Sequence, residues 1–383
     1  MIPYGKQSIN QNDVYSVIEA LKSDRITQGN KVIEFERALA NYTGAKFCVV
    51  CNNGTAALHS AYAAANLGPG DEFITSPLTF VATANAGVWQ GATPVFVDID
   101  PKTGNIDPQN IESAITQKTK VIAPIDYAGR PSDYLVIKDI ARKHNLMIVE
   151  DACQGLGGAY YNKKVGSITD LSVFSFHPVK SITTGEGGAI LTDDEILYKK
   201  MKQFITHGVN REDFIYPLPG PWYFEMQQLG INYRLTDIQC ALGISQLKRL
   251  DKFIERRREI AKNYTKELQN IDQIITPPMD TGIIQSAWHL YVVRLTKNLV
   301  SKKRRIVEEL HKEGIGVQVH HVPVHTHPYY VERFGTSYGD YPKAEAFYEA
   351  AFSLPIYPTL SINDQQKVID TLKSVIKTSS QIQ

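Results

Sequence analysis

The chain has 383 residues, of which 43% are hydrophobic and 21% charged, and its formal net charge is +1 at pH 7. This length predicts roughly two globular domains, and the near-neutral charge without a basic stripe excludes nucleic acid and anionic membranes as expected partners. No apolar run approaches the roughly 20 residues of a transmembrane helix, and the N-terminus lacks the basic and apolar regions of a signal peptide, so we expect a cytoplasmic protein.

Short apolar runs and helical patterns alternate along the first two thirds of the chain, after two predicted N-terminal helices, the first over residues 13–21. The runs that predict strands cover residues 46–51, 72–76, 94–99, 120–125, 146–150, 171–176 and 188–192. Helical patterns separate most of them, as at residues 55–68, 108–115 and 133–145. This alternation predicts an α/β fold: a mainly parallel seven-stranded sheet with helices on both faces.

Two of the four cysteines, Cys48 and Cys51, form a C-x-x-C pattern inside the first apolar run. Residues three apart in a strand point to opposite faces of the sheet. Core packing is therefore the favoured interpretation, and a redox pair is the alternative.

The alternation of strand and helix patterns ends near residue 235. One long helical pattern begins there, and we expect it to bend near Gly243. A strand at 288–295, a helix, a second strand near 314–321 and two final helices are predicted to follow. We therefore expect a large α/β domain over residues 1–245 and a smaller α+β domain over residues 246–383.

Three polar features follow three of the predicted strands. Gly54-Thr55-Ala56 opens a helix after the first strand, Asp151 follows the fifth, and Lys180 lies shortly after the sixth. Taken singly, they could be a helix turn, a helix cap and a surface lysine. Ligands of open α/β sheets bind beyond the carboxyl ends of the strands, so these features should face one crevice.

Together, the three features suit pyridoxal phosphate. This cofactor needs an amine that holds its aldehyde as a Schiff base and an acid that keeps its pyridine nitrogen protonated. Its phosphate needs donors such as the N–H groups at a helix N-terminus. Lys180, Asp151 and Gly54-Thr55-Ala56 match these requirements in turn.

Nine segments spread over essentially the whole chain resemble a known family. They include "IPYGKQSI", "NNGTAALH", "SPLTFVATANA", "EDACQGLGG", "SFHPVKSITTGEGG" and "GINYRLTDIQCALG". The sequence is similar to the DegT/DnrJ/EryC1/StrS sugar aminotransferases, which are fold type I pyridoxal-phosphate enzymes. This resemblance implies a homodimer with composite active sites and transfer of an amino group from L-glutamate to a nucleotide-linked keto-sugar.

The resemblance implies a role for each matching residue around the cofactor. Lys180 would be the Schiff-base lysine and the general base and acid, and Asp151 would pair with the pyridinium nitrogen. Gln154 would lie beside the 3-hydroxyl, and Phe80 would stack on the ring. The residues implied to hold the phosphate are Thr55, Ala56, Ser175 and, from the partner subunit, Asn232.

Within the family, the chain is most similar to the pseudaminic-acid-pathway enzymes that aminate a UDP-linked 4-keto-6-deoxy-N-acetylhexosamine. The pointers are "IDYAGRP" at 125–131 and the histidine-rich "VQVHHVPVHTHPYY" near the C-terminus. His321 is a departure, since family members often carry tyrosine there. The residues implied to contact the substrate are Tyr4, Arg211, Arg234, His320, His321, His325 and Tyr329.

Several alternatives remain open at this point. The histidine-rich segment could bind a metal on composition alone, but no cysteine or acidic cluster accompanies it, so we expect none. A sister enzyme could aminate a dTDP-keto-sugar or a UDP-4-keto-pentose. Sugar dehydratases of this fold carry histidine in place of the lysine, which Lys180 argues against. A regulator that binds the cofactor without turnover is a further alternative.

Overall fold

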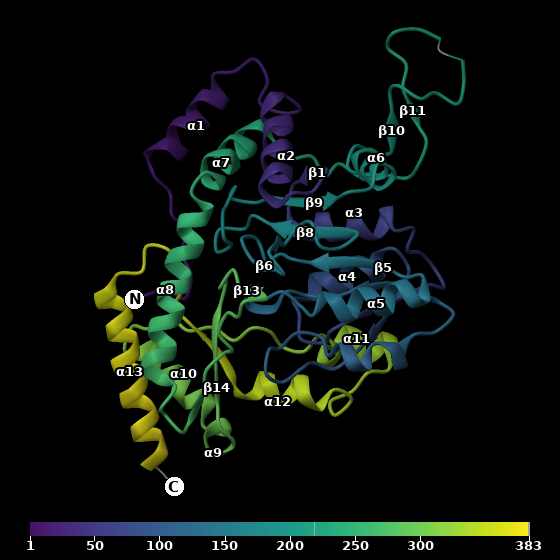
Figure 1. Ribbon diagram of the computed structural model, residues 1–383. Helices are drawn as coiled ribbons and strands as arrows, with labels where there is room; N and C mark the ends of the chain where they lie inside the picture. Colours follow the sequence, from purple (N-terminus) through teal and green to yellow (C-terminus); the bar gives the residue numbers. More distant parts are fainter. Residues whose placement is uncertain (218, 382–383) are drawn as a thin grey trace.

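A computed structural model describes residues 1–217 and 219–381 (Figure 1). Its helices are α1 (Gln11–Leu21), α2 (Asn30–Thr43), α3 (Gly54–Ala64), α4 (Val81–Trp89), α5 (Tyr134–His144), α6 (Glu195–Phe204), α7 (Asp237–Leu247), α8 (Leu250–Leu268), α9 (Lys297–Val300), α10 (Lys303–Lys312), α11 (Pro328–Phe334), α12 (Pro342–Ala350) and α13 (Ile362–Gln381). The large sheet comprises β1 (Phe47–Cys51), β2 (Glu72–Thr75), β3 (Thr93–Phe96), β4 (Thr119–Ala123), β5 (Met147–Asp151), β8 (Leu171–Ser175) and β9 (Gly188–Thr192).

The seven-stranded sheet has the order β1-β9-β8-β5-β4-β2-β3. The neighbours from β8 through β3 pair in parallel, and β9 runs antiparallel to both β8 and β1. The predicted fold class, a mainly parallel seven-stranded sheet, is confirmed. Its parallel strands all end at one edge, which is where the polar features described above converge.

Helices cover both faces of this sheet, as the near-continuous apolar strands predict. Side chains of α3, α4 and α6 pack in one cluster with Val49 and Cys51 of β1. Side chains of α2, α7 and α8 pack in another cluster with Cys48 and Val50 of the same strand. The two cysteines are buried, free and on opposite faces, so core packing is confirmed as their role.

The C-terminal unit contains a small antiparallel sheet of β12 (Ile274–Ile275), β14 (Tyr291–Leu295) and β15 (Ala351–Leu354), with α10 and α13 packed beside each other (Figure 1). The strand predicted near 314–321 is wrong. That segment makes only isolated bridges, one of them from Gln318 to Ser353, and the place beside β14 is taken by β15.

Two predicted helices also differ from the structure. The long helical pattern breaks at Lys248 and Arg249, between α7 and α8, and not at Gly243. Gly243 lies where a side chain would clash with the ring of Phe35, so it permits close packing of α7 on α2 and not a bend. The helix predicted over 108–115 is two short 3₁₀ turns, Pro108–Asn110 and Glu112–Ala114.

The remaining strands are short: β6 (Ala159–Tyr160), β7 (Lys163–Lys164), β10 (Val209–Asn210), β11 (Glu225–Met226) and β13 (Ile284–Gln285). β10 and β11 belong to an arm that projects from the body of the protein (Figure 1). Within the described ranges, none of the helices combines the length and the apolar character needed to cross a membrane.

Candidate active site

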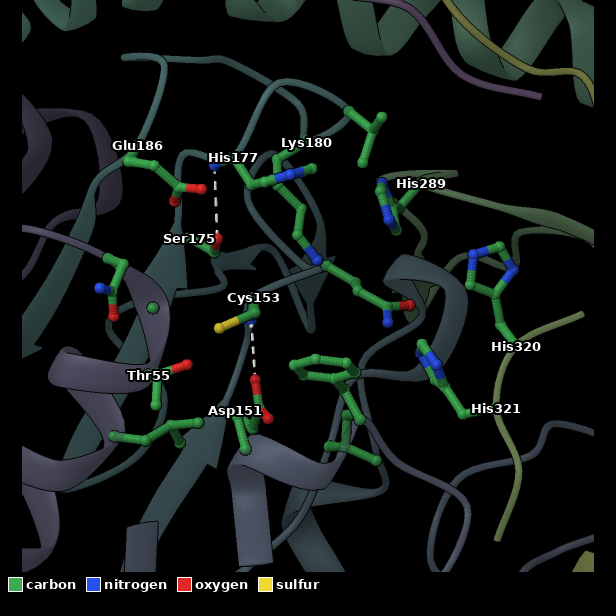
Figure 2. Close-up of a pocket in the computed structure, with 18 of the residues that line it drawn as sticks. Thr55, Asp151, Cys153, Ser175, His177, Lys180, Glu186, His289, His320 and His321 are labelled. Carbon is green, nitrogen blue, oxygen red and sulfur yellow. Dashed lines mark hydrogen bonds between the residues drawn. The ribbon is translucent and has the colours of Figure 1, made fainter. Parts of the chain in front are cut away.

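A cavity of about 530 Å³ lies at the carboxyl ends of β1, β5 and β8. Figure 2 shows Thr55, Asp151 and Ser175 reaching it from the segments at these strand ends, with His320 and His321 along another side. Its lining residues include Tyr4, Asn53, Gly54, Thr55, Phe80, Asp151, Cys153, Gln154, Ser175, His177, Lys180, Glu186, His289, His320 and His321. The lysine, the aspartate and the helix N-terminus therefore do face one crevice, as predicted.

Asp151 ends β5 and is only 3% exposed, yet both of its carboxylate oxygens have donors. The N–H of Cys153 donates to Oδ1 at 3.1 Å, and the hydroxyl of Thr83 donates to Oδ2 at 2.5 Å. The hydroxyl of Thr79 lies 2.7 Å from that of Thr83, so it donates in turn to Thr83. These bonds fix a carboxylate at the floor of the cavity, where a protonated ring nitrogen can pair with it.

The orientation of the Gln154 amide follows from one contact. Its Oε1 accepts a hydrogen bond of 2.7 Å from the N–H of Ala128. The carboxamide NH₂ is therefore left for the cavity, which Gln154 lines. A donor in this place suits an anionic or phenolic oxygen such as the 3-hydroxyl of pyridoxal phosphate.

Lys180 is presented by a tight turn in which its own N–H donates to the carbonyl of His177 at 2.9 Å. Burial lowers the pKa of Lys180 below that of an exposed lysine, although the nearby Cys153 and Asp151 act in the opposite direction. A larger fraction of this amine is consequently neutral and nucleophilic near physiological pH. Burial raises the pKa of the Cys153 thiol, which argues against a thiolate nucleophile at this place.

The N-terminus of α3 forms a cradle for an anion. Asn53 caps the helix through Oδ1, which accepts from the N–H of Ala56 at 2.7 Å. The preceding N–H groups, those of Gly54 and Thr55, come before the first turn is closed, and both residues line the cavity, so these donors are available to an anion there. A side chain at Gly54 would meet Cβ of Ser175 at 2.9 Å, so glycine allows this close approach.

Aromatic side chains line the opposite part of the cavity. Phe80 is 55% exposed at the start of α4. Its ring centroid lies 5.7 Å from that of His321, and the Tyr4 ring lies 5.4 Å from His320. An exposed aromatic ring beside a lysine and a carboxylate suits stacking on a planar cofactor.

Six of the predicted substrate or cofactor residues do not line the cavity: Ala56, Arg211, Asn232, Arg234, His325 and Tyr329. The N–H of Ala56 is taken by the side chain of Asn53, and Arg234 is half-buried in the segment before α7. His325 is completely buried, with Nε2 2.8 Å from Glu345, and so does not line the cavity. Arg211 lies on the projecting arm, over the ring of Phe224, and Tyr329 is a half-exposed residue of α11. Asn232 is exposed, and its Oδ1 accepts from the N–H of Arg234.

The sequence did not predict a role for three residues that line the cavity, Asn53, Glu186 and His289, or for Thr83, which bonds to Asp151. Asn53 had a usable signal, because asparagine before a glycine-led helix is a preferred N-cap. Thr83 and His289 had none, since their neighbours in space, Asp151 and Lys180, are distant in the sequence. Among the described residues, no group of histidine, cysteine and acidic side chains could hold a metal ion.

The fold and these side chains define a fold type I, pyridoxal-phosphate-dependent aminotransferase. Comparison with known proteins leads to the same class, since residues 7–373 match the model of the DegT/DnrJ/EryC1/StrS aminotransferase family. The chain belongs to this family.

Three relatives illustrate the match. The chain is 41% identical to the Bacillus subtilis spore coat polysaccharide biosynthesis protein SpsC, over 98% of this chain and 97% of that protein. It is 39% identical to the UDP-4-amino-4,6-dideoxy-N-acetyl-beta-L-altrosamine transaminase of Campylobacter jejuni, over 98% of both chains. The structure of Helicobacter pylori PseC, an aminotransferase of pseudaminic acid biosynthesis, superposes with a TM-score of 0.92 at 36% identity, covering 98% of this chain and 99% of that one.

Substitution of the lysine tests the assignment of the cofactor site. Lys180→Ala should fold and retain cofactor non-covalently, because the cradle and Asp151 are unchanged, but it should lose transamination. Borohydride reduction followed by peptide mass spectrometry should find cofactor attached to Lys180 only in the unsubstituted protein. Near-native turnover by the variant would show that another residue carries the chemistry.

Substitution of Thr83 tests how Asp151 is held. Thr83→Val keeps the shape but removes a hydrogen bond to a charged group, typically worth about 1.5–3 kcal/mol, so cofactor affinity should fall roughly tenfold to a hundredfold. Thr79→Val is the matched control, since Thr79 contacts Thr83 and not the carboxylate. Equal losses of cofactor in the two variants, measured by equilibrium dialysis, would contradict this reasoning.

Proposed function

We propose that this protein transfers an amino group from L-glutamate to a nucleotide-linked keto-sugar, most specifically to C4 of UDP-2-acetamido-2,6-dideoxy-hex-4-ulose. The observation that carries the proposal is a wall of neutral imidazoles, His289, His320 and His321, beside Lys180. The names of the Campylobacter and Helicobacter relatives support the choice of a UDP-linked aminosugar and of pseudaminic acid biosynthesis.

The three histidines remain uncharged at physiological pH. Burial, followed by the charges of neighbouring groups, lowers the pKa of His320 to about 4, that of His321 to about 3, and that of His289 well below its ordinary value. Nδ1 of His289 and Nε2 of His321 are inaccessible to solvent and have no hydrogen-bond partner within the described chain. The imidazoles that line the cavity therefore offer polar rings without charge.

Neutral imidazoles suit the hydroxyl, keto and acetamido groups of a sugar better than they suit a carboxylate. In the parts of the chain that the structure describes, no arginine lines the cavity, so a bidentate partner for a dicarboxylate is missing from it. The carboxylates of glutamate and the diphosphate of a nucleotide sugar would therefore need cations from outside this single-chain cavity. The sugar proposal rests on the uncharged imidazoles, and the UDP and C4 assignments rest on the relatives.

The residues of the chain would divide the chemistry as follows. The bound cofactor would supply an electron sink that stabilises negative charge on the carbon that loses its proton. Lys180 would hold the cofactor and then use its amine to move a proton from the α-carbon of glutamate, and later to the reacting carbon of the sugar. Asp151 would keep the ring nitrogen protonated, while Gln154 and Phe80 would orient the ring.

Other sugars remain candidates because relatives of similar identity carry other names. SpsC of Bacillus subtilis is named for spore coat polysaccharide biosynthesis. The GDP-perosamine synthase of Caulobacter vibrioides is 36% identical to this chain over 96% of both chains. A dTDP-keto-sugar or a UDP-4-keto-pentose is the second candidate for the substrate.

We also propose a homodimer with composite active sites. Two exposed apolar surfaces support it: the outer face of α1, with Val14 41% and Leu21 56% exposed, and the projecting arm, with Trp222 74% and Leu229 83% exposed. Surfaces of this kind mark protein interfaces. Glu186 also lines the cavity, and its carboxylate would repel an anionic substrate. Cations from a partner subunit would offset this repulsion.

A substrate comparison tests the proposed reaction. With glutamate as donor, a 4-keto UDP-sugar should be aminated at least about tenfold faster than a 3-keto UDP-sugar, a difference of about 1.4 kcal/mol in transition-state binding. Mass spectrometry of the products gives the rates. Preference for the 3-keto sugar or for a small keto acid would overturn the substrate assignment, while the glutamate half-reaction, measured separately, reports on the cofactor chemistry.

The contribution of the imidazole wall can be isolated in the same assay. His321→Phe keeps an aromatic ring beside Phe80 but removes the ring nitrogens that would bond to the sugar. It should lower kcat/KM for the sugar and leave the glutamate half-reaction nearly unchanged. Losses of equal size in both half-reactions would contradict a role in sugar binding.

Subunit mixing tests the composite site. Lys180→Ala and Asn232→Trp should each be inactive alone, and mixing them should restore part of the activity. A mixed dimer has one site with both Lys180 and Asn232 intact only if Asn232 serves the neighbouring subunit. The absence of rescue, once subunit exchange is confirmed by mass-tagged dimers, would count against this proposal.

A further inference from the structure

Two carboxyl groups lie together behind the cavity floor, where the proposed reaction does not use them. Asp126 follows β4, and Glu150 directly precedes Asp151 in β5. Both side chains are 0% exposed. The two carboxyls contact each other, and the charge of Glu150 acts directly on Asp126.

Each carboxyl has one oxygen with donors and one without. Oδ1 of Asp126 accepts from the N–H of Ser132 at 3.1 Å and from the hydroxyl of Tyr134 at 2.7 Å. Oε2 of Glu150 accepts from the hydroxyls of Thr169, at 3.0 Å, and Ser172. Oδ2 of Asp126 and Oε1 of Glu150 are buried, and no described residue donates to them.

Two ionised carboxylates are unfavourable in such a place. No cationic group appears among the interactions that act on either carboxyl from the described parts of the chain, and the titratable group that faces them is the Tyr134 phenol. Like charges at close range in a buried site cannot both persist, and a buried acceptor without a donor costs about 1–3 kcal/mol. One proton between the two unpartnered oxygens removes both problems.

We propose that Asp126 and Glu150 share a single proton, held between Oδ2 and Oε1, and that this hydrogen bond positions Asp151 and Gln154. The pair carries one negative charge in place of two. The inference concerns the cofactor side of the site and does not depend on which sugar is the substrate.

Backbone contacts connect the pair to the cofactor residues. The N–H of Asp126 donates to the carbonyl of Asp151 at 3.1 Å, and the N–H of Asp151 donates to the carbonyl of Pro124 at 2.9 Å. The turn that carries Gln154 rests on Asp126, since a side chain at Gly155 would meet Oδ2 at 2.6 Å. Separation of the two carboxyls would therefore move the end of β5 and the turn that follows it.

The electrostatics agree in direction with a retained proton. Burial, and for Asp126 also the charge of Glu150, raises the pKa of both carboxyls above their ordinary values. The folded protein then holds a proton that the unfolded chain has lost at neutral pH. The stabilisation is present at acidic pH and is lost as the pH rises from the ordinary carboxyl range toward the raised pKa.

Infrared spectroscopy of the holoenzyme in D₂O tests the shared proton directly. At neutral pH the wild type should show the carbonyl stretch of a protonated carboxyl. Glu150→Gln and Asp126→Asn should each abolish it, because an amide NH₂ replaces the shared proton as donor. Asp13→Asn should not, because Asp13 is paired with Arg249. A wild type without the band, or a band that survives in both amide variants, would overturn the proposal.

A pH series separates this role from general packing. The unfolding equilibrium constant of the wild type should rise relative to that of Glu150→Gln by up to about tenfold per pH unit above the ordinary carboxyl range. Cofactor dissociation, measured by dialysis, should become more pH-dependent in the wild type than in the two amide variants. If stability and cofactor dissociation depend on pH in the same way in all three proteins, the pair does not share a proton that positions Asp151 and Gln154.

Discussion

The active site depends on one buried carboxylate, that of Asp151. A charge at 3% exposure is stable only if donors surround it, and here a backbone N–H and the Thr83 hydroxyl supply them. The donors come from different segments, α4 and the turn after β5, so the carboxylate joins elements that are distant in sequence. A protonated ring nitrogen is then the partner that completes the site.

The same cavity separates two kinds of polar group. Around Asp151 and α3 the polar groups suit charged partners: the N-terminus of α3 can bind an anion, and the Asp151 carboxylate can bind a cation. Around His289, His320 and His321 burial suppresses charge and leaves hydrogen-bonding atoms. This division matches a cofactor with fixed charges at one side and a variable, uncharged substrate group at the other.

Sequence patterns correctly predicted those segments whose local pattern matches their place in the folded protein. The apolar runs predicted the strands of the large sheet, and the residues after β1, β5 and β8 predicted the convergence of Thr55, Asp151 and Lys180. Residues 314–321 look like a strand, but this segment makes only isolated bridges, one of them from Gln318 to Ser353 of β15. His325 looked like part of the histidine loop, yet only tertiary structure shows that it turns inward to Glu345.

The proposed composite site agrees with what a single chain supplies. Pyridoxal phosphate, glutamate and a nucleotide diphosphate are all anionic, while the described lining of the cavity offers Lys180 as its cationic side chain and Glu186 as an opposing charge. Lys180 would hold the cofactor, so under this proposal further cations would come from residues outside this cavity. The arm that bears Arg211 extends away from its own site (Figure 1), and a second copy of the chain would give that arm a surface to cover. Substrate binding would then depend on dimer formation, because the second subunit would supply the positive charge that the anionic ligands need.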